Sequence, residues 1–154
     1  MEQRESVFEN IPQLDDDTRR EVYEDLRQKL ITSLEKYPFV QEMFALPGTN
    51  NLIIDSRNIA TTDSAYKITR NTHTDSIEIS VDKLGRRDNP NIILESIRFK
   101  TPRIGITDFP PMLEYHRTLK KGGSRTLQNN IPALRRIEGF ISHMEKDLKQ
   151  AKSK

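Results

Sequence analysis

The sequence predicts an α+β fold, in which an antiparallel sheet of about four to five strands is flanked by helices from both ends of the chain. Apolar residues recur at helical spacing near each end, whereas from about residue 51 they alternate with a period of two. A length of 154 residues is typical of one domain. We therefore expect a single domain over residues 1–154, with N-terminal helices at about 16–46, the sheet at about 51–106 and C-terminal helices at about 109–150.

The first helix is expected to begin near Thr18, because Thr18 and Glu21 have the spacing of a capping box and follow an acidic run. An apolar stripe continues from there at helical spacing through Val22, Leu26, Leu30 and Leu34. Pro38 should end or bend this helix. A second, short helical segment is expected over residues 39–44.

The middle of the chain is expected to form four strands, around residues 52–54, 66–68, 77–81 and 92–99. In the third of these, Ile77, Ile79 and Val81 alternate with polar residues, so one face of the sheet should be wet and the sheet antiparallel. Residues 85–90 (GRRDNP) predict a hairpin turn that exposes an arginine pair. A possible fifth strand covers residues 104–106.

The last third of the sequence predicts two helices. Asp108 can cap the first of them, whose buried side would carry Met112, Tyr115 and Leu119 before two glycines end it. The final helix should begin near Pro132 and carries a heptad-like apolar seam of Leu134, Ile137, Ile141, Met144 and Leu148. This seam spans about two heptads, so it predicts packing on the sheet or a neighbouring helix, with helix-mediated self-association as the alternative.

Several classes of protein are excluded by composition. There is no cysteine, so disulfides, thiolate metal sites, iron–sulfur clusters and cysteine nucleophiles are absent. The first residues are acidic where a secretory peptide would be apolar, and no apolar run approaches the length of a membrane span. We expect a protein of the cell or host cytosol, without a membrane partner, a metal or a cofactor.

None of the three histidines predicts a catalytic site. His116 is expected to be a partly buried structural residue on a helix, and His143 precedes Asp147 by four residues, which predicts a local surface pair. His73 lies in a polar stretch. A two-histidine phosphoesterase would need a hydroxyl residue two positions after each histidine on a strand; Thr118 follows His116 in this way, but the expected helix removes that geometry.

A metal-dependent nuclease is a lesser alternative. Such an enzyme needs a strand-borne aspartate and, on another strand, a carboxylate and a lysine two residues apart, to hold Mg²⁺ and position water. Asp55, Glu78 and Glu95 supply carboxylates on expected strands. No lysine follows either glutamate at the required spacing, and the glycine pair at 122–123 lacks the pattern of a phosphate-binding loop. The sequence therefore favours a protein that is not an enzyme.

Charge is distributed unevenly along the chain. Residues 1–46 carry 6 Lys and Arg against 11 Asp and Glu, whereas residues 110–154 carry 10 against 4. The first hypothesis is an interaction module that binds a protein partner or itself, through Ile137, Ile141, Met144 and Leu148. The alternative is a nucleic-acid-binding protein whose basic residues contact phosphates; these are Arg117, Lys120, Lys121, Arg125, Arg135 and Arg136.

Overall fold

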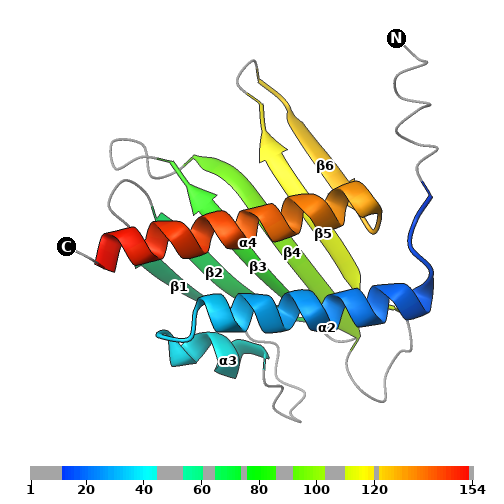
Figure 1. Cartoon of the computed structure of the whole chain (residues 1–154), viewed down its shortest axis with the longest axis horizontal. Helices are drawn as coiled ribbons and strands as arrows, with labels where there is room; N and C mark the ends of the chain where they lie inside the picture. The colour runs from blue at the N-terminus through cyan, green and yellow to red at the C-terminus, as the bar shows by residue number, and fades with distance from the viewer. Residues whose placement is uncertain are drawn as a thin grey trace.

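The computed structural model describes residues 12–44, 54–60, 65–73, 76–85, 92–102, 110–119 and 122–152. It has two layers, a six-stranded antiparallel sheet and helices across one face of it (Figure 1). The strands are β1 (Ile54–Ala60), β2 (Ala65–Thr72), β3 (Ser76–Leu84), β4 (Ile93–Pro102), β5 (Met112–Thr118) and β6 (Ser124–Gln128), and the helices are α2 (Asp16–Ser33), α3 (Pro38–Phe44) and α4 (Ile131–Lys152). The predicted α+β class is confirmed.

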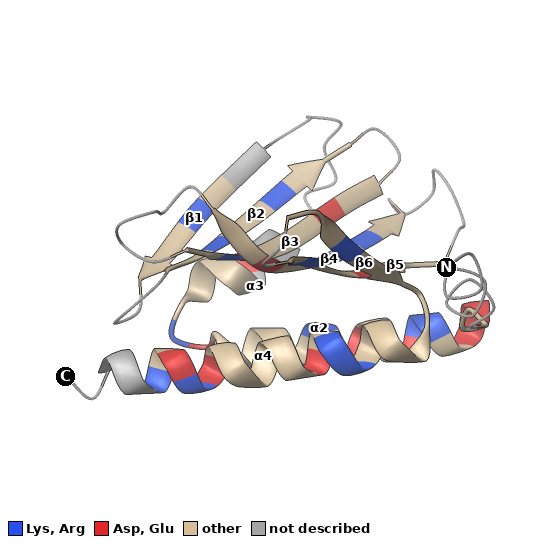
Figure 2. Cartoon of the chain, turned by 90° about the horizontal axis from the view of Figure 1, so that it is seen from above, with Lys and Arg blue, Asp and Glu red and all other residues tan. Residues whose placement is uncertain are grey.

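Each strand pairs with the strand that follows it in the sequence, so the spatial order is β1 to β6. The two long helices, α2 and α4, lie side by side under one face, and the other face carries no described helix (Figure 2). Side chains along each strand point alternately to these two faces. The face that packs on the helices is mostly apolar, and the open face is mostly polar, as the alternation in Ile77–Val81 predicted.

The predicted helix over residues 109–119 is wrong. Met112–Thr118 forms β5, and Gly122 and Gly123, both with positive φ, turn the chain into β6. Apolar Leu113 and Tyr115 are separated by the polar Glu114, so the segment also fits a period of two. Seven residues are too few to distinguish this period from the helical one. The glycines adopt left-handed conformations that suit a hairpin turn. The sheet therefore has more strands than predicted.

Other boundaries differ by a few residues. The N-cap of α2 is Asp15, not Thr18, because the Asp15 carboxylate accepts a hydrogen bond of 2.8 Å from the Thr18 backbone N–H. This bond lowers the pKa of the Asp15 carboxyl. Pro38 is the first residue of α3, a position that needs no N–H donor. Most of the predicted turn at 85–90, the predicted strand at 104–106 and Asp108 lie outside the described residues.

One apolar core joins the helices to the sheet. Leu26 and Leu30 of α2 pack in it with Ile68, Val81 and Ile97 of the sheet. The seam of α4 lies in the same core, with Ile137 and Met144 at 0% exposure, Ile141 at 3% and Leu148 at 8%. The seam is therefore covered within one copy of the chain, which was the first of its two interpretations. Helices from the two ends of the chain also meet in one copy, where Lys29 contacts Glu138 at 3.0 Å. This pair joins a cation of the acidic third to a carboxylate of the basic third, so it does not itself balance the difference in charge between the ends.

Candidate functional site

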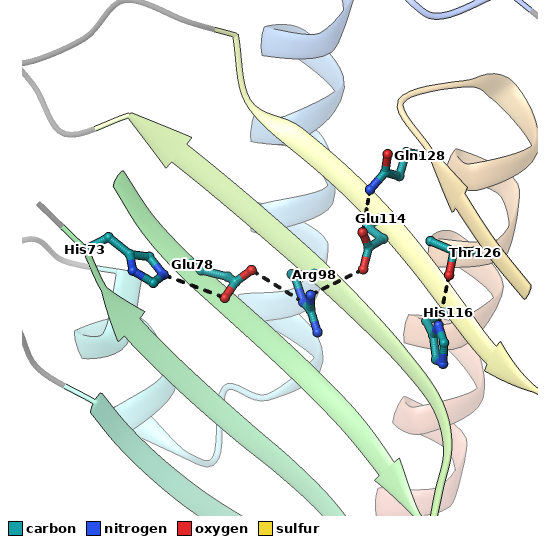
Figure 3. A network of polar contacts seen from close by, with 7 residues as sticks. All are labelled: His73, Glu78, Arg98, Glu114, His116, Thr126 and Gln128. Carbon is teal, nitrogen blue, oxygen red and sulfur yellow. Dashed lines mark hydrogen bonds and ion pairs between the residues drawn. The ribbon is translucent and has the colours of Figure 1, made fainter. Parts of the chain in front are cut away.

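Polar side chains gather in two places, of which the first is the open face of the sheet (Figure 3). A row of contacts crosses neighbouring strands there. Arg98 on β4 lies 3.5 Å from Glu78 on β3 and 3.5 Å from Glu114 on β5, while Gln128 on β6 donates a hydrogen bond of 2.6 Å to Glu114. His73 lies 4.0 Å from Glu78. Because both carboxylates have partners within the row, we interpret it as a structural link between strands.

His116 also lies on the open face, on β5 and not on the helix that the sequence predicted, and its Nδ1 is 2.9 Å from the Thr126 hydroxyl. His116 and Thr118 do share a strand face, as a two-histidine phosphoesterase would require. His73, however, follows the end of β2, three strands away from β5. Three strand spacings are about 14 Å, too far for two imidazoles to act on one phosphate.

The carboxylates of the nuclease hypothesis do not converge. Glu78 faces the open side of the sheet, whereas Glu95 lines a cavity on the helix side. The side chain of Asp55 lies outside the described part of the chain. Within the described residues no group of three His, Cys, Asp or Glu side chains could hold a metal ion. The structure thus gives this lesser alternative no geometric support.

The second polar site is a pocket of about 190 Å³ between α4 and the sheet. Four lining residues come from consecutive strands, and the others come from one side of α4: Tyr66, Lys83, Glu95, Tyr115, Arg135, Arg136, Gly139, Phe140 and His143. Strand register explains the set. Tyr66 pairs with Lys83, and Lys83 pairs with Glu95, so these side chains form one row on the helix side. At Gly139 no side chain fills the space, and a Cβ there would meet no atom within 4 Å.

Hydrogen bonds hold the polar groups of the pocket in place. The Tyr66 hydroxyl donates to Asp147 at 2.6 Å, and the Tyr115 hydroxyl donates to Glu95. Lys83 Nζ lies 3.1 Å from His143 Nε2, and His143 lies 3.5 Å from Asp147. The predicted pair of His143 and Asp147 is confirmed. Its place beside the pocket was not predicted.

Both phenols in the pocket are stabilised in the neutral form. Burial, followed by the hydrogen bond to Asp147, raises the pKa of Tyr66. Burial and the Glu95 carboxylate raise the pKa of Tyr115 to about 12, although the charges of Arg117 and Arg136 act in the opposite direction. Both hydroxyls therefore remain hydrogen-bond donors at neutral pH.

Cations surround this pocket. Lys83, Arg135 and Arg136 line it, and Arg117 follows in the strand row because it pairs with Glu95. Among the described residues, no carboxylate lies within ion-pair distance of these four side chains. Arg125 pairs directly with Arg117 across β5 and β6, so two like charges lie on neighbouring strands there.

The structure brings together part of the predicted basic set. Arg117, Arg125, Arg135 and Arg136 come from the β5–β6 hairpin and the first turns of α4, while Lys120 and Lys121 lie outside the described residues. Sequence reasoning missed the strand residues Tyr66, Lys83 and Glu95. One signal could have found Lys83, because it continues the alternation of Ile77, Ile79 and Val81 and so had to face the helices.

A larger groove of about 310 Å³ runs between α2 and α4 on the outer side of the helix layer. Its charged residues are largely paired, since Lys29 contacts Asp25 at 3.6 Å and Glu138 at 3.0 Å. Such exposed pairs are typical of a solvated helix surface. This groove therefore offers no concentration of unpaired charge.

Replacing Tyr115 with Phe is expected to flatten the loss of stability at high pH. A phenol whose pKa is raised by folding stabilises the protein fully below its unfolded pKa of about 10, and this contribution is lost as the pH rises through about 12. Urea unfolding between about pH 9 and pH 12 should therefore show a smaller decline for the Tyr115→Phe variant than for the parent. Parallel curves would contradict the assigned environment of Tyr115.

Among the described helices, none combines the length and the apolar run that a bilayer crossing requires. No family model, no curated protein and no solved structure matches this chain.

Proposed function

We propose that this protein binds a phosphate-bearing ligand, whose phosphate lies in the pocket between α4 and the sheet. The observation that supports this most is that three cations, Lys83, Arg135 and Arg136, line the pocket without a carboxylate at ion-pair distance among the described residues. Arg117 follows next to Glu95 in the strand row. Arginine side chains bind phosphate oxygens through paired N–H donors, and lysine binds them as a compact charge. A phosphate would add negative charge to a lining in which Glu95 is the one carboxylate beside Lys83, Arg135 and Arg136.

The pocket also has donors suited to a phosphate. Lys83 lines it from the sheet, and Arg135 and Arg136 line it from α4, whereas the Tyr66 and Tyr115 hydroxyls keep their single protons on Asp147 and Glu95. A volume of about 190 Å³ is below the ~300–1,000 Å³ of sites for drug-sized ligands, and it suits one phosphate group with its nearest atoms. The rest of a larger ligand would lie outside, along the arginines of the β5–β6 hairpin.

The two hypotheses from the sequence bear differently on this proposal. The nucleic-acid hypothesis also relied on basic residues that contact phosphates. The present proposal keeps this kind of contact and places it at the pocket. A protein partner would need a surface other than the α4 seam, because Ile137, Ile141, Met144 and Leu148 are buried in the core. The geometry thus supports phosphate binding better than association through the seam.

The test is a titration with inorganic phosphate, followed by NMR chemical shifts because weak affinities are measurable in this way. Replacing Lys83 or Arg136 with Met should weaken binding about tenfold or more, since a hydrogen bond to a charged group contributes about 1.5–3 kcal/mol. The matched control is Lys100→Met, which removes a cation from the open face. Equal affinity in all three variants would refute the pocket as the binding site.

A second variant separates the pocket from the general basic charge. Gly139→Leu leaves every charge in place, improves helix propensity and directs its side chain into the open space beside the helix. It should abolish phosphate binding while the protein remains folded. If a single-stranded oligonucleotide still binds this variant with a steep dependence on salt, the arginines act as a nucleic-acid surface without the pocket.

A further inference from the structure

The strand row that lines the pocket continues beyond it in two arginines of the β5–β6 hairpin. Glu95 lines the pocket, and its cross-strand partner on β5 is Arg117, whose own partner on β6 is Arg125. Direct partners on neighbouring strands point to the same face of a sheet, so Arg117 and Arg125, which we call the hairpin arginines, lie on the helix side with Glu95. Both are exposed, and the ends of β5 and β6 project past α4 in Figure 1. A ligand that starts in the pocket can therefore reach them.

Electrostatics also links Arg117 to the pocket. Burial and the Glu95 carboxylate raise the pKa of Tyr115, a lining residue, and the charges of Arg117 and Arg136 oppose this rise. Arg136 belongs to the pocket lining on α4, whereas Arg117 lies on β5. The cations of the pocket and the hairpin arginines thus approach the same phenol from two elements, which makes the two surfaces neighbours.

The charge of these two surfaces suits two phosphates. The pocket lining has three cations, and Glu95 is its one carboxylate, so the lining carries an excess of two positive charges. A phosphate monoester carries about 1.5–2 negative charges at neutral pH, which matches this excess. The hairpin arginines place two further positive charges beside the lining. A second phosphate matches these two charges in the same way.

We propose that the ligand is a small bisphosphate, whose second phosphate binds the hairpin arginines. This inference rests on the proposed function, in which the first phosphate occupies the pocket. Glu95 lies between Lys83 and Arg117 in the strand row, and its negative charge keeps the two phosphates apart. Lys83 and Arg117 are two strand spacings, or about 10 Å, apart, so a linker of several atoms has to join the phosphates. Among the described strands the row ends at Arg125 on β6, and it therefore accommodates two phosphates and not a long polyanion.

The experiment compares butane-1,4-diol bisphosphate with 4-hydroxybutyl phosphate, which has the same linker and one phosphate, at constant ionic strength. The bisphosphate should bind about tenfold or more tightly, because its second phosphate gains hydrogen bonds to charged groups. Replacing Arg117 with Gln should remove this gain and leave the affinity for 4-hydroxybutyl phosphate nearly unchanged. Lys100→Met is the matched control, because it removes a cation from the open face and should leave the gain intact.

The outcomes distinguish this inference from the proposed function. If neither compound binds, both are overturned. If the two compounds bind with equal affinity, the bisphosphate is overturned and the phosphate site in the pocket remains. A gain that survives in the Arg117→Gln variant would also overturn the bisphosphate, since its second phosphate would lie elsewhere. Tighter binding of an oligonucleotide with a terminal phosphate would overturn the small ligand and make the hairpin arginines part of a nucleic-acid surface. Unchanged binding of 4-hydroxybutyl phosphate by the Arg117→Gln variant verifies that it is folded.

Discussion

Replacing Ile137 with Asp is expected to leave the chain unfolded at 25 °C. Ile137 is 0% exposed in the core between α4 and the sheet. The substitution removes a packed aliphatic side chain and buries a carboxylate without a partner, which costs several kcal/mol, against a net stability of about 5–15 kcal/mol for a typical domain. The milder Ile137→Ala should lower the free energy of unfolding by about 2–5 kcal/mol, measured by urea unfolding.

Ser142→Asp is the control for this substitution. Ser142 is exposed on the same helix, so the same added charge should change stability by no more than about 0.5 kcal/mol. If the Ile137→Asp chain instead remained folded and only its oligomeric mass changed, α4 would pack against a partner and not against the sheet. Circular dichroism and light scattering on the same samples separate these outcomes.

Replacing Arg98 with Met is expected to lower the free energy of unfolding by about 1–3 kcal/mol. Arg98 lies between Glu78 and Glu114, at 3.5 Å from each, and Glu114 is only 9% exposed. Without the guanidinium, two carboxylates on the same face lose their shared cation and one of them stays nearly buried. A fully buried pair would cost about 3–5 kcal/mol, and we reduce this value because Arg98 itself is partly exposed to solvent.

Lys100→Met is the matched control for Arg98, because Lys100 is a cation on the same strand and the same face. Lys100 is the cross-strand partner of Glu78 but forms no ion pair with it, so the substitution should lower stability by about 0.2–1 kcal/mol, less than the loss of Arg98. Thermal or urea unfolding of the two variants provides the comparison. Equal losses would mean that the row in Figure 3 adds no stability beyond that of any surface cation.

The fold class was predictable because it depends on periodicity. The helical spacing from Leu26 to Leu34 and from Ile137 to Leu148 correctly predicted two helices that bury one side. The period of two in Ile77–Val81 correctly predicted a sheet with one wet face. Met112–Thr118 was not predictable in the same way, because its apolar residues fit both periods and only pairing with β4 and β6 selects the strand.

The residues of the pocket were harder to predict from the sequence. Its strand residues lie on β2, β3, β4 and β5, and only the register of these strands places Tyr66, Lys83 and Glu95 in one row. Arg135 and Arg136 were predicted to bind phosphates because they lie in a basic region of the chain. The residues around these two arginines were not predictable. Gly139 leaves open space beside them, and Lys83 contacts His143 in the same pocket.

The sequential order of the strands affects the entropy of folding. Every strand pairs with its neighbour in the chain, so each pairing closes a short loop, and the cost of loop closure grows only with the logarithm of loop length. The contact between α2 and α4 is different, because Lys29 and Glu138 are 109 residues apart. The ends of the chain therefore carry the largest loop-closure cost, and the burial of Leu30, Ile137 and their neighbours must offset it.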